Sequence, residues 1–151
     1  IIPFKRMIHH GLAAIMPAHV IYPKVDKHPA GFSKIWLQDI LRKRLGFQGV
    51  IFSDDLDMQG ASVAGETYTD RADAALGAGC DMALICNNRQ GAIEILDNLQ
   101  DTNDPVSHLR LARMHGLKNF TMKDLHASYE WKQACESLRR YQDDPTLQLE
   151  L

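Results

Sequence analysis

The stretch GVIFSD, Gly49–Asp54, decides the fold, because a nearly continuous apolar run ends there in a serine and an aspartate, with Asp55 next. A run that does not alternate between apolar and polar residues is typical of a strand buried on both faces, as in parallel sheets covered by helices. Two more runs have the same character, AAIMPAHVIY at Ala13–Tyr22 and DMALICN at Asp81–Asn87. The sequence therefore predicts three parallel strands.

Helical patterns follow each of these runs. The first extends from an N-cap at Ser33 to a glycine stop at Gly46, and the second from Thr69 to Gly79. The third, over residues 88–99, places four apolar residues on one stripe: Ala92, Ile95, Leu96 and Leu99. Strands that alternate with helices predict an α/β fold with right-handed crossovers.

The C-terminal part of the sequence has only helical patterns. One starts with the N-cap pair Asp104-Pro105 and ends at Gly116, a second has a capping-box pattern that begins at Thr121, and a third starts at Ser128. The third carries an apolar stripe formed by Trp131, Cys135 and Leu138. Residues 141–151 are expected to fray. We predict three βα units, a piece of a larger α/β architecture, over residues 1–103, and helices over residues 104–151 that pack on the same domain.

Composition and charge argue against several classes of partner. The formal net charge of -2 leaves no basic field for nucleic acid, and the apolar runs are too short to cross a membrane. The three cysteines, Cys80, Cys86 and Cys135, lack the spacing of metal ligands. We therefore expect reduced thiols rather than disulfides or a metal site, and neither a nucleic-acid nor a membrane partner.

Asp54, Asp55 and Asp57 stand at the strand end where βα folds gather their catalytic groups. Side chains alternate along a strand, so Asp54 and Asp55 point to opposite faces. They cannot be the two carboxyl groups of a retaining glycosidase, which lie roughly 5–5.5 Å apart. A carboxylate that extends a Val-Ile-Phe strand is costly unless it is used or paired, which favours a chemical role for Asp54. The loop position of Asp57 favours capping of the turn or helix that follows.

The segment LRKRLGFQGVIFSDDLDMQGA, Leu41–Ala61, closely resembles the nucleophile signature of glycoside hydrolase family 3, in particular the bacterial β-N-acetylhexosaminidases of peptidoglycan recycling. Gly11–Arg42, Ala74–Ala92 and Leu111–Trp131 resemble the same family in the same order, so the likeness covers nearly the whole chain. A long ordered match is more specific than any single short motif. The family's nucleophile is the first acid after the serine, and the resemblance assigns that role to Asp54.

The resemblance implies a (β/α)8 TIM-type barrel. The three apolar runs would be its sixth, seventh and eighth strands, so the chain would supply about three βα units and the C-terminal helices. It also implies a retaining hydrolase in which Asp54 attacks the anomeric carbon of a terminal β-linked N-acetylglucosamine of a muropeptide, without a metal or organic cofactor. Such an enzyme would be cytoplasmic and bacterial.

The resemblance also indicates what these 151 residues lack. In the family, the general acid/base is a histidine on a mobile loop after an earlier strand, and a Lys-His pair binds the sugar nearby; neither motif occurs here. KHPAG, Lys27–Gly31, contains a similar pair but follows the sixth-strand candidate, so we do not assign it that role. His19, near the end of that strand, is a candidate for lining the sugar pocket. We expect a C-terminal fragment of somewhat less than half of the enzyme.

Two alternatives stay open at the level of the sequence. A truncated barrel without catalytic activity could have a structural role and self-associate through the open edges of its sheet, because unpaired strand edges invite association. A different βα-barrel hydrolase or lyase could share the aspartate at the strand end, since one fold hosts many chemistries.

Overall fold

The computed structural model describes residues 1–100, 104–116 and 120–143. Contacts divide the chain into two compact units, Ile1–His115 and Gly116–Leu151, and each is described by itself. Helix α4 (Pro105–Ala112) belongs to the first unit. The domain boundary between residues 103 and 104 stays a prediction. Of the tail that was expected to fray, residues 144–151 lie outside the described residues.

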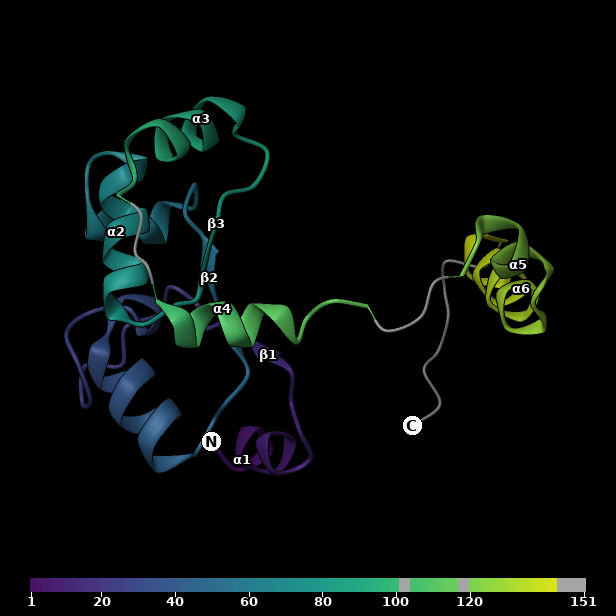
Figure 1. The fold of residues 1–151 in the computed structure, drawn as a ribbon, viewed down its shortest axis with the longest axis horizontal. Helices are drawn as coiled ribbons and strands as arrows, with labels where there is room; N and C mark the ends of the chain where they lie inside the picture. The colour runs from purple at the N-terminus through teal and green to yellow at the C-terminus, as the bar shows by residue number, and fades with distance from the viewer. Residues whose placement is uncertain (101–103, 117–119, 144–151) are drawn as a thin grey trace. The chain divides into compact units, whose positions relative to one another are not determined.

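Three parallel strands form the centre of the first unit, in the order β1 (Ala14–Ile15), β2 (Val50–Asp55) and β3 (Met82–Leu84) (Figure 1). In the ladder between β1 and β2, Ala14 is paired with Val50. The predicted α/β class and the parallel sheet are therefore confirmed.

The strand predicted over Ala13–Tyr22 is wrong in extent, because β1 stops at Ile15. Pro17 follows two residues later, and a proline has no N–H with which to continue a ladder. The chain then forms a loop that is closed by an antiparallel bridge between Ile21 and Pro29. His19 consequently lies in a loop beyond the strand rather than within it.

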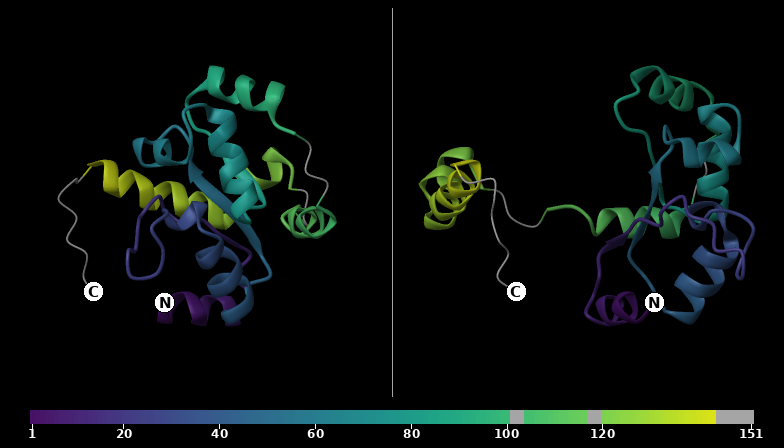
Figure 2. Two further views of the ribbon diagram at one scale, coloured as in Figure 1. Left: turned by 90° about the vertical axis from the view of Figure 1, so that its left-hand side faces the viewer. Right: turned by 180° about the vertical axis from the view of Figure 1, so that it is seen from behind.

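The helices of the first unit follow the strands in the predicted alternation (Figures 1 and 2). After β1 come the short 3₁₀ turn η1 and the wide π-type helix η2; after β2 come the 3₁₀ segment η3 and helix α2; helices α3 and α4 follow β3. Their bounds, with those of the N-terminal helix α1, are α1 Ile2–His9, η1 Ala30–Phe32, η2 Ile35–Arg44, η3 Gln59–Ala64, α2 Tyr68–Ala78, α3 Arg89–Asn98 and α4 Pro105–Ala112.

Side-chain caps explain where several of these helices begin. For η2 the predicted N-cap at Ser33 is one residue early, because Lys34 is the N-cap residue; the Ser33 hydroxyl nevertheless accepts the N–H of Trp36 at 3.2 Å. Helix α2 begins one residue before the predicted Thr69, because Thr67 and Asp70 form a reciprocal capping box. The Asp104 carboxylate accepts two N–H groups of the first turn of α4, which confirms this predicted N-cap. Gly79 ends α2 with φ +121°, a conformation that favours glycine.

The hydrophobic core lies between these helices and one face of β2. Ile51 on β2 is fully buried, and the small residues of α2 let that helix pack closely on the sheet, beside β2 and β3 in both figures. The core residues are Leu37, Leu41, Phe47, Ile51, Leu56, Ala72, Ala75, Ala78, Cys80 and Ile95.

The apolar stripe predicted for α3 is wider than the face that the core covers. Ile95 is buried, but Leu96 is 81% exposed. Successive residues of a helix are turned by about 100°, so the face that directs Ile95 toward α2 directs Leu96 away from it. Leu96 therefore belongs to the part of the predicted stripe that the core does not cover.

A buried carboxylate connects the N-terminal ends of the strands with the neighbouring helices. Asp81, just before β3, accepts a hydrogen bond from Arg42 of η2 at 2.6 Å and from Arg110 of α4 at 3.0 Å. It also accepts the backbone N–H of Ile51 on β2 at 2.8 Å. The Asp81 side chain is only 2% exposed. One carboxylate thus connects two helices with two strands.

The second unit consists of helices α5 (Met122–Ala127) and α6 (Tyr129–Asp143). Both predicted caps are confirmed: Thr121 accepts the N–H of Asp124 at 3.1 Å, and Ser128 accepts the N–H of Trp131 at 3.2 Å. Leu138 of the predicted apolar stripe is 63% exposed. Among the helices that the structure describes, none has both the length and the hydropathy needed to cross a membrane.

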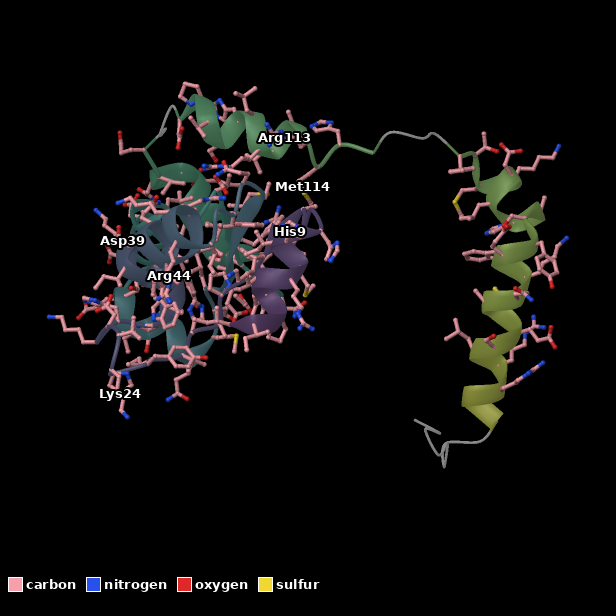
Figure 3. The ribbon with its side chains drawn as sticks, turned by 90° about the horizontal axis from the view of Figure 1, so that it is seen from below. His9, Lys24, Asp39, Arg44, Arg113 and Met114 are labelled. Atoms are coloured by element: carbon pink, nitrogen blue, oxygen red, sulfur yellow. The ribbon has the colours of Figure 1, made fainter. Side chains whose placement is uncertain are left out.

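Substitution of Asp81 is expected to destabilise the folded chain strongly. Asp81→Ala leaves the guanidinium of Arg42 buried without a counter-charge, which typically costs about 3–5 kcal/mol. Urea unfolding followed by circular dichroism measures the change in the free energy of unfolding. Asp39→Ala is the control, because Asp39 is 55% exposed and pairs only with Lys43 on the outer face of η2 (Figure 3). A loss at Asp81 no larger than the loss at Asp39 would contradict this account.

Cys80 is expected to be the least reactive of the three thiols in the folded chain. Burial, and to a smaller extent the charge of Asp81, raises its pKa from 9.0 to about 12. Near pH 8 the thiolate fraction is then roughly 10³-fold below that of an ordinary cysteine. Iodoacetamide labelling followed by mass spectrometry should modify the partly exposed Cys135 first and Cys80 last. Equal rates for Cys80 in buffer and in denaturant would show the burial to be wrong.

The raised pKa of Cys80 also predicts that the folded chain loses stability in alkaline solution. The unfolded chain ionises Cys80 near pH 9.0, whereas the folded chain retains the thiol proton up to about 12. The stabilisation is therefore fully present below pH 9.0 and is lost as the pH rises through that interval. Unfolding midpoints measured over this range should fall less in Cys80→Ala than in the unsubstituted chain.

Candidate active site

The carboxyl end of the sheet brings together groups from three separate segments. Asp54 and Asp55 end β2, His19 comes from the loop after β1, and Cys86 follows β3. Asp55 is the meeting point: its carbonyl oxygen lies 3.1 Å from Nε2 of His19, and its Oδ1 accepts the N–H of Cys86 at 2.9 Å. The carboxyl ends of parallel strands are where βα folds place their reactive groups.

Asp54 lies near the carboxyl end of β2 and, like Phe52 on the same strand, is only partly buried. Ile51, in contrast, belongs to the core beneath the helices. Alternation in an unbroken strand would place Asp54 on the side of Phe52, away from that core. Its side chain is half-buried, and within the described part of the chain its one hydrogen bond is from the N–H of Asp55 to Oδ1, at 2.9 Å. One carboxylate oxygen of Asp54 is therefore uncommitted.

Asp55 and Asp57 are both engaged in hydrogen bonds, and the cap of the turn is Asp55 rather than the favoured Asp57. Asp55 Oδ1 accepts the N–H of Asp57 at 3.0 Å, so the residue that caps the turn is Asp55. Asp57 was predicted to be this cap, but it accepts side-chain hydrogen bonds from Tyr68 Oη at 2.5 Å and from Asn88 Nδ2 at 2.9 Å. These partners lie 11 and 31 residues further along the chain, beyond the reach of a local pattern.

The two donors lower the pKa of the Asp57 carboxyl below its usual range, with the Tyr68 hydroxyl as the larger cause. The same contact raises the pKa of Tyr68. Asn88 also uses its carboxamide oxygen to accept the N–H of Gly91 at 2.8 Å, which caps α3. Asn88 therefore both caps α3 and donates to Asp57. No local signal in the sequence pointed to Tyr68.

The His19 side chain contacts the backbone at the end of β2. Nε2 faces a carbonyl oxygen and so carries the proton, and the ring stacks on Phe32 with 4.8 Å between ring centres. Nδ1 is buried and has no hydrogen-bond partner in the described part of the chain. Whether His19 also lines a sugar pocket stays a prediction.

The Lys27–Gly31 stretch is engaged within its own loop. His28 Nδ1 lies 3.1 Å from the Asp26 carboxylate, and the Ser33 hydroxyl donates to the same carboxylate. The Ser33 hydrogen bond is the main cause that lowers the pKa of Asp26. These contacts give His28 a partner within its own loop.

Among the described residues, no group of three or more His, Cys, Asp or Glu side chains is arranged to hold a metal ion. Asp54 is the least engaged of the three carboxylates in the described part of the chain, and the chemistry that it can perform is that of a carboxylate with a free oxygen. Such a group can act as a nucleophile or as a base.

Comparison with known proteins gives a consistent result. The family profile described as "Glycosyl hydrolase family 3 N terminal domain" matches residues 1–115. A "Beta-hexosaminidase" of Thioalkalivibrio sulfidiphilus (strain HL-EbGR7) is 54% identical over all 151 residues. A second protein of that name, from Methylobacillus flagellatus, is 62% identical over 113 residues, which are 75% of this chain and 32% of that protein.

Solved structures show the same likeness. NagZ from Neisseria gonorrhoeae in complex with N-trifluoroacetyl-D-glucosamine has a TM-score of 0.75 and 37% identity, over 90% of this chain and 38% of that one. A family 3 β-N-acetylglucosaminidase from Paenibacillus sp. str. FPU-7 has a TM-score of 0.67 and 26% identity, over 90% of this chain and 29% of that one. The chain spans 43% of the Thioalkalivibrio protein.

Removal of the Tyr68 hydroxyl is expected to raise the pKa of Asp57 back toward 3.8, because that hydroxyl is the largest cause of the lowering. Carboxyl carbon shifts recorded by NMR against pH, in the unsubstituted chain and in Tyr68→Phe, measure this change. Tyr22→Phe is the matched control. Since the pKa of Asp57 is lowered in the folded chain, its stabilisation is present above pH 3.8 and is lost as the pH falls through the folded-state value. An unchanged titration of Asp57 in Tyr68→Phe would contradict the assigned contact.

Proposed function

Because the chain belongs to glycosyl hydrolase family 3, we propose that it carries the catalytic nucleophile of a retaining β-N-acetylhexosaminidase, and that this nucleophile is Asp54. The observation that carries the proposal is the position of the Asp54 carboxylate. It stands at the carboxyl end of β2, is only partly buried, and has one oxygen without a hydrogen bond in the described part of the chain.

In the proposed reaction, the free oxygen of Asp54 attacks the anomeric carbon of the sugar. A bond forms between the carboxylate and that carbon while the bond to the leaving group breaks with inversion. Water then attacks the same carbon, displaces the carboxylate and restores the original configuration. A general acid must protonate the leaving oxygen in the first step and act as the base toward water in the second.

The general acid is proposed to come from the part of the enzyme that this chain does not span. Asp55 and Asp57 each accept two hydrogen bonds on Oδ1 that tie them to neighbouring segments, and neither is assigned that role. The chain alone is accordingly expected to have little or no glycosidase activity. Without a general acid the leaving group departs unprotonated, which typically costs on the order of 10²–10⁴ in rate.

The complete barrel is also part of the proposal. Three parallel strands with helices after each one would supply the last three βα units of an eight-unit barrel, and five units would come from the remaining length of the enzyme. Both the parallel order of the strands and the coverage of 43% of the Thioalkalivibrio relative support this division.

The proposed substrate is a muropeptide fragment with a terminal β-linked N-acetylglucosamine, cleaved in the bacterial cytoplasm during peptidoglycan recycling. The names of the relatives support a hexosaminide, and the complex of the Neisseria enzyme with N-trifluoroacetyl-D-glucosamine supports an N-acylated glucosamine at the site. A half-barrel with a purely structural role has no comparable support.

The test is a chimera in which this chain replaces the matching 43% of the Thioalkalivibrio relative, so that the relative supplies the rest of the enzyme. With an aryl β-N-acetylglucosaminide as substrate, Asp54→Asn is expected to lower kcat/KM by roughly 10³-fold or more, because the covalent step is lost. Asp39→Asn is the matched control on the exposed face of η2 and should retain full activity.

A second measurement identifies the role of Asp54 as that of a nucleophile. Sodium azide can enter the space left by Asp54→Ala and attack the anomeric carbon in its place. Turnover should return with azide, and the product should be the glycosyl azide of α configuration, since one displacement inverts the β configuration. Full activity of Asp54→Asn, or rescue that yields the β azide, would rule out this assignment.

A further inference from the structure

The ladder between β2 and β3 is irregular at the residues that surround Asp54. Phe52 is paired with Met82, but the next pair joins Asp55 with Leu84. From one pair to the next β2 advances three residues, from 52 to 55, whereas β3 advances two, from 82 to 84. β2 therefore contains one extra residue between these pairs, which is a β-bulge. Bulges next to active sites redirect a side chain.

Two side chains of β2 take the place of the interrupted backbone ladder. Ser53 is fully buried, and its hydroxyl accepts the backbone N–H of Leu84 at 2.8 Å. Asp55 Oδ1 accepts the backbone N–H of Cys86 at 2.9 Å. The residues immediately before and after Asp54 thus both hold the neighbouring strand through their side chains.

Further contacts secure Asp55 from the other sides. Its carbonyl oxygen lies 3.1 Å from His19 Nε2 and accepts the N–H of Met58 at 3.1 Å, and its carboxylate also accepts the N–H of Asp57. Asp55, the residue next to Asp54, is therefore connected to the loop after β1, to the segment that ends β3 and to the turn that follows β2. Asp54 itself makes none of these connections and keeps its free oxygen.

We propose that Ser53 and Asp55 are positioning residues for the nucleophile: their side-chain hydrogen bonds to Leu84 of β3 and to Cys86 just after it hold the bulge that presents the Asp54 carboxylate to the sugar. This inference rests on the proposed function of Asp54. A small misplacement of a reacting group lowers the rate, since near-attack geometry requires the reacting atoms to be about 3–3.5 Å apart, and an error of 1 Å can cost about 10²-fold. Neither residue contacts the substrate in this scheme.

The first test measures the hydrogen bonds in the 151-residue chain itself. Amide hydrogen exchange followed by NMR should become faster at Leu84 in Ser53→Ala and at Cys86 in Asp55→Ala. Ser53→Thr and Asp55→Asn keep an acceptor oxygen in place and should retain protection. Unchanged exchange at both amides in the alanine variants would overturn the proposal.

The second test measures nucleophilic attack in the chimera with the Thioalkalivibrio relative. A 5-fluoro glycosyl fluoride of N-acetylglucosamine traps the covalent intermediate: the carboxylate forms a bond to the anomeric carbon, and fluoride leaves. Mass spectrometry locates the label and gives its rate of formation. Ser53→Ala and Asp55→Ala are expected to slow labelling of Asp54 by about 10- to 100-fold. With the aryl substrate, kcat should fall while KM changes little.

Conservative and remote variants separate positioning from a general loss of structure. Ser53→Thr and Asp55→Asn should label within a few-fold of the unsubstituted rate, and Ser62→Ala, a matched change in the exposed segment η3, should have no effect. Labelling of Asp54 at the unsubstituted rate in both alanine variants would overturn the positioning role alone. Failure of the unsubstituted chimera to label Asp54 would overturn the proposed function and, with it, this inference.

Discussion

The ion pair between Asp81 and Arg42 is the contact on which the three-stranded unit depends. The two side chains are 2% and 8% exposed, and their closest atoms are 2.6 Å apart. Burial lowers the pKa of Arg42, and the neighbouring Asp81 opposes that effect. Arg42 also donates to the carbonyl groups of Phe47 and Gly49 just before β2, so the pair joins η2, β2 and β3 at one edge of the sheet. Because buried charge holds the N-terminal ends of the strands together, their carboxyl ends are free to carry reactive groups.

The three aspartates at the carboxyl end of β2 show that the partners of a carboxylate decide its use. Asp55 has two backbone N–H donors on one oxygen, and Asp57 has a hydroxyl and an amide donor on one oxygen. Asp54 has one N–H donor, from its own neighbour. A carboxylate with several donors is stabilised as an anion and is a poorer nucleophile, since its charge is already shared with those donors. The least supported of the three is therefore the one best suited to form a bond to carbon.

Much of this arrangement follows from local patterns in the sequence, and the rest depends on contacts that local patterns do not contain. Continuous apolar runs predicted the parallel strands, and Ser, Thr and Asp at helix starts predicted the caps, because both effects act over a few residues. The end of β1 at Ile15 follows from the nearby Pro17, which the continuous apolar run did not take into account. The exposure of Leu96 and the partners of Asp57 depend on segments distant in sequence. The bulge beside Asp54 is of the same kind, since it exists only through the N–H groups of β3.

The buried and the partly exposed side chains of β2 have different roles. On the helix side, Ile51 is packed in the core and Ser53 is tied to β3. On the other side, Phe52 and Asp54 are only partly covered by the described part of the chain. Side chains that form the core cannot shift without opening cavities, so the helix side gives the strand a fixed position. A nucleophile gains from that rigidity because its geometry is set before the substrate binds. Specificity for the sugar, in contrast, must come from groups that face Asp54 across the open side, and the proposed five remaining βα units are where those groups would lie.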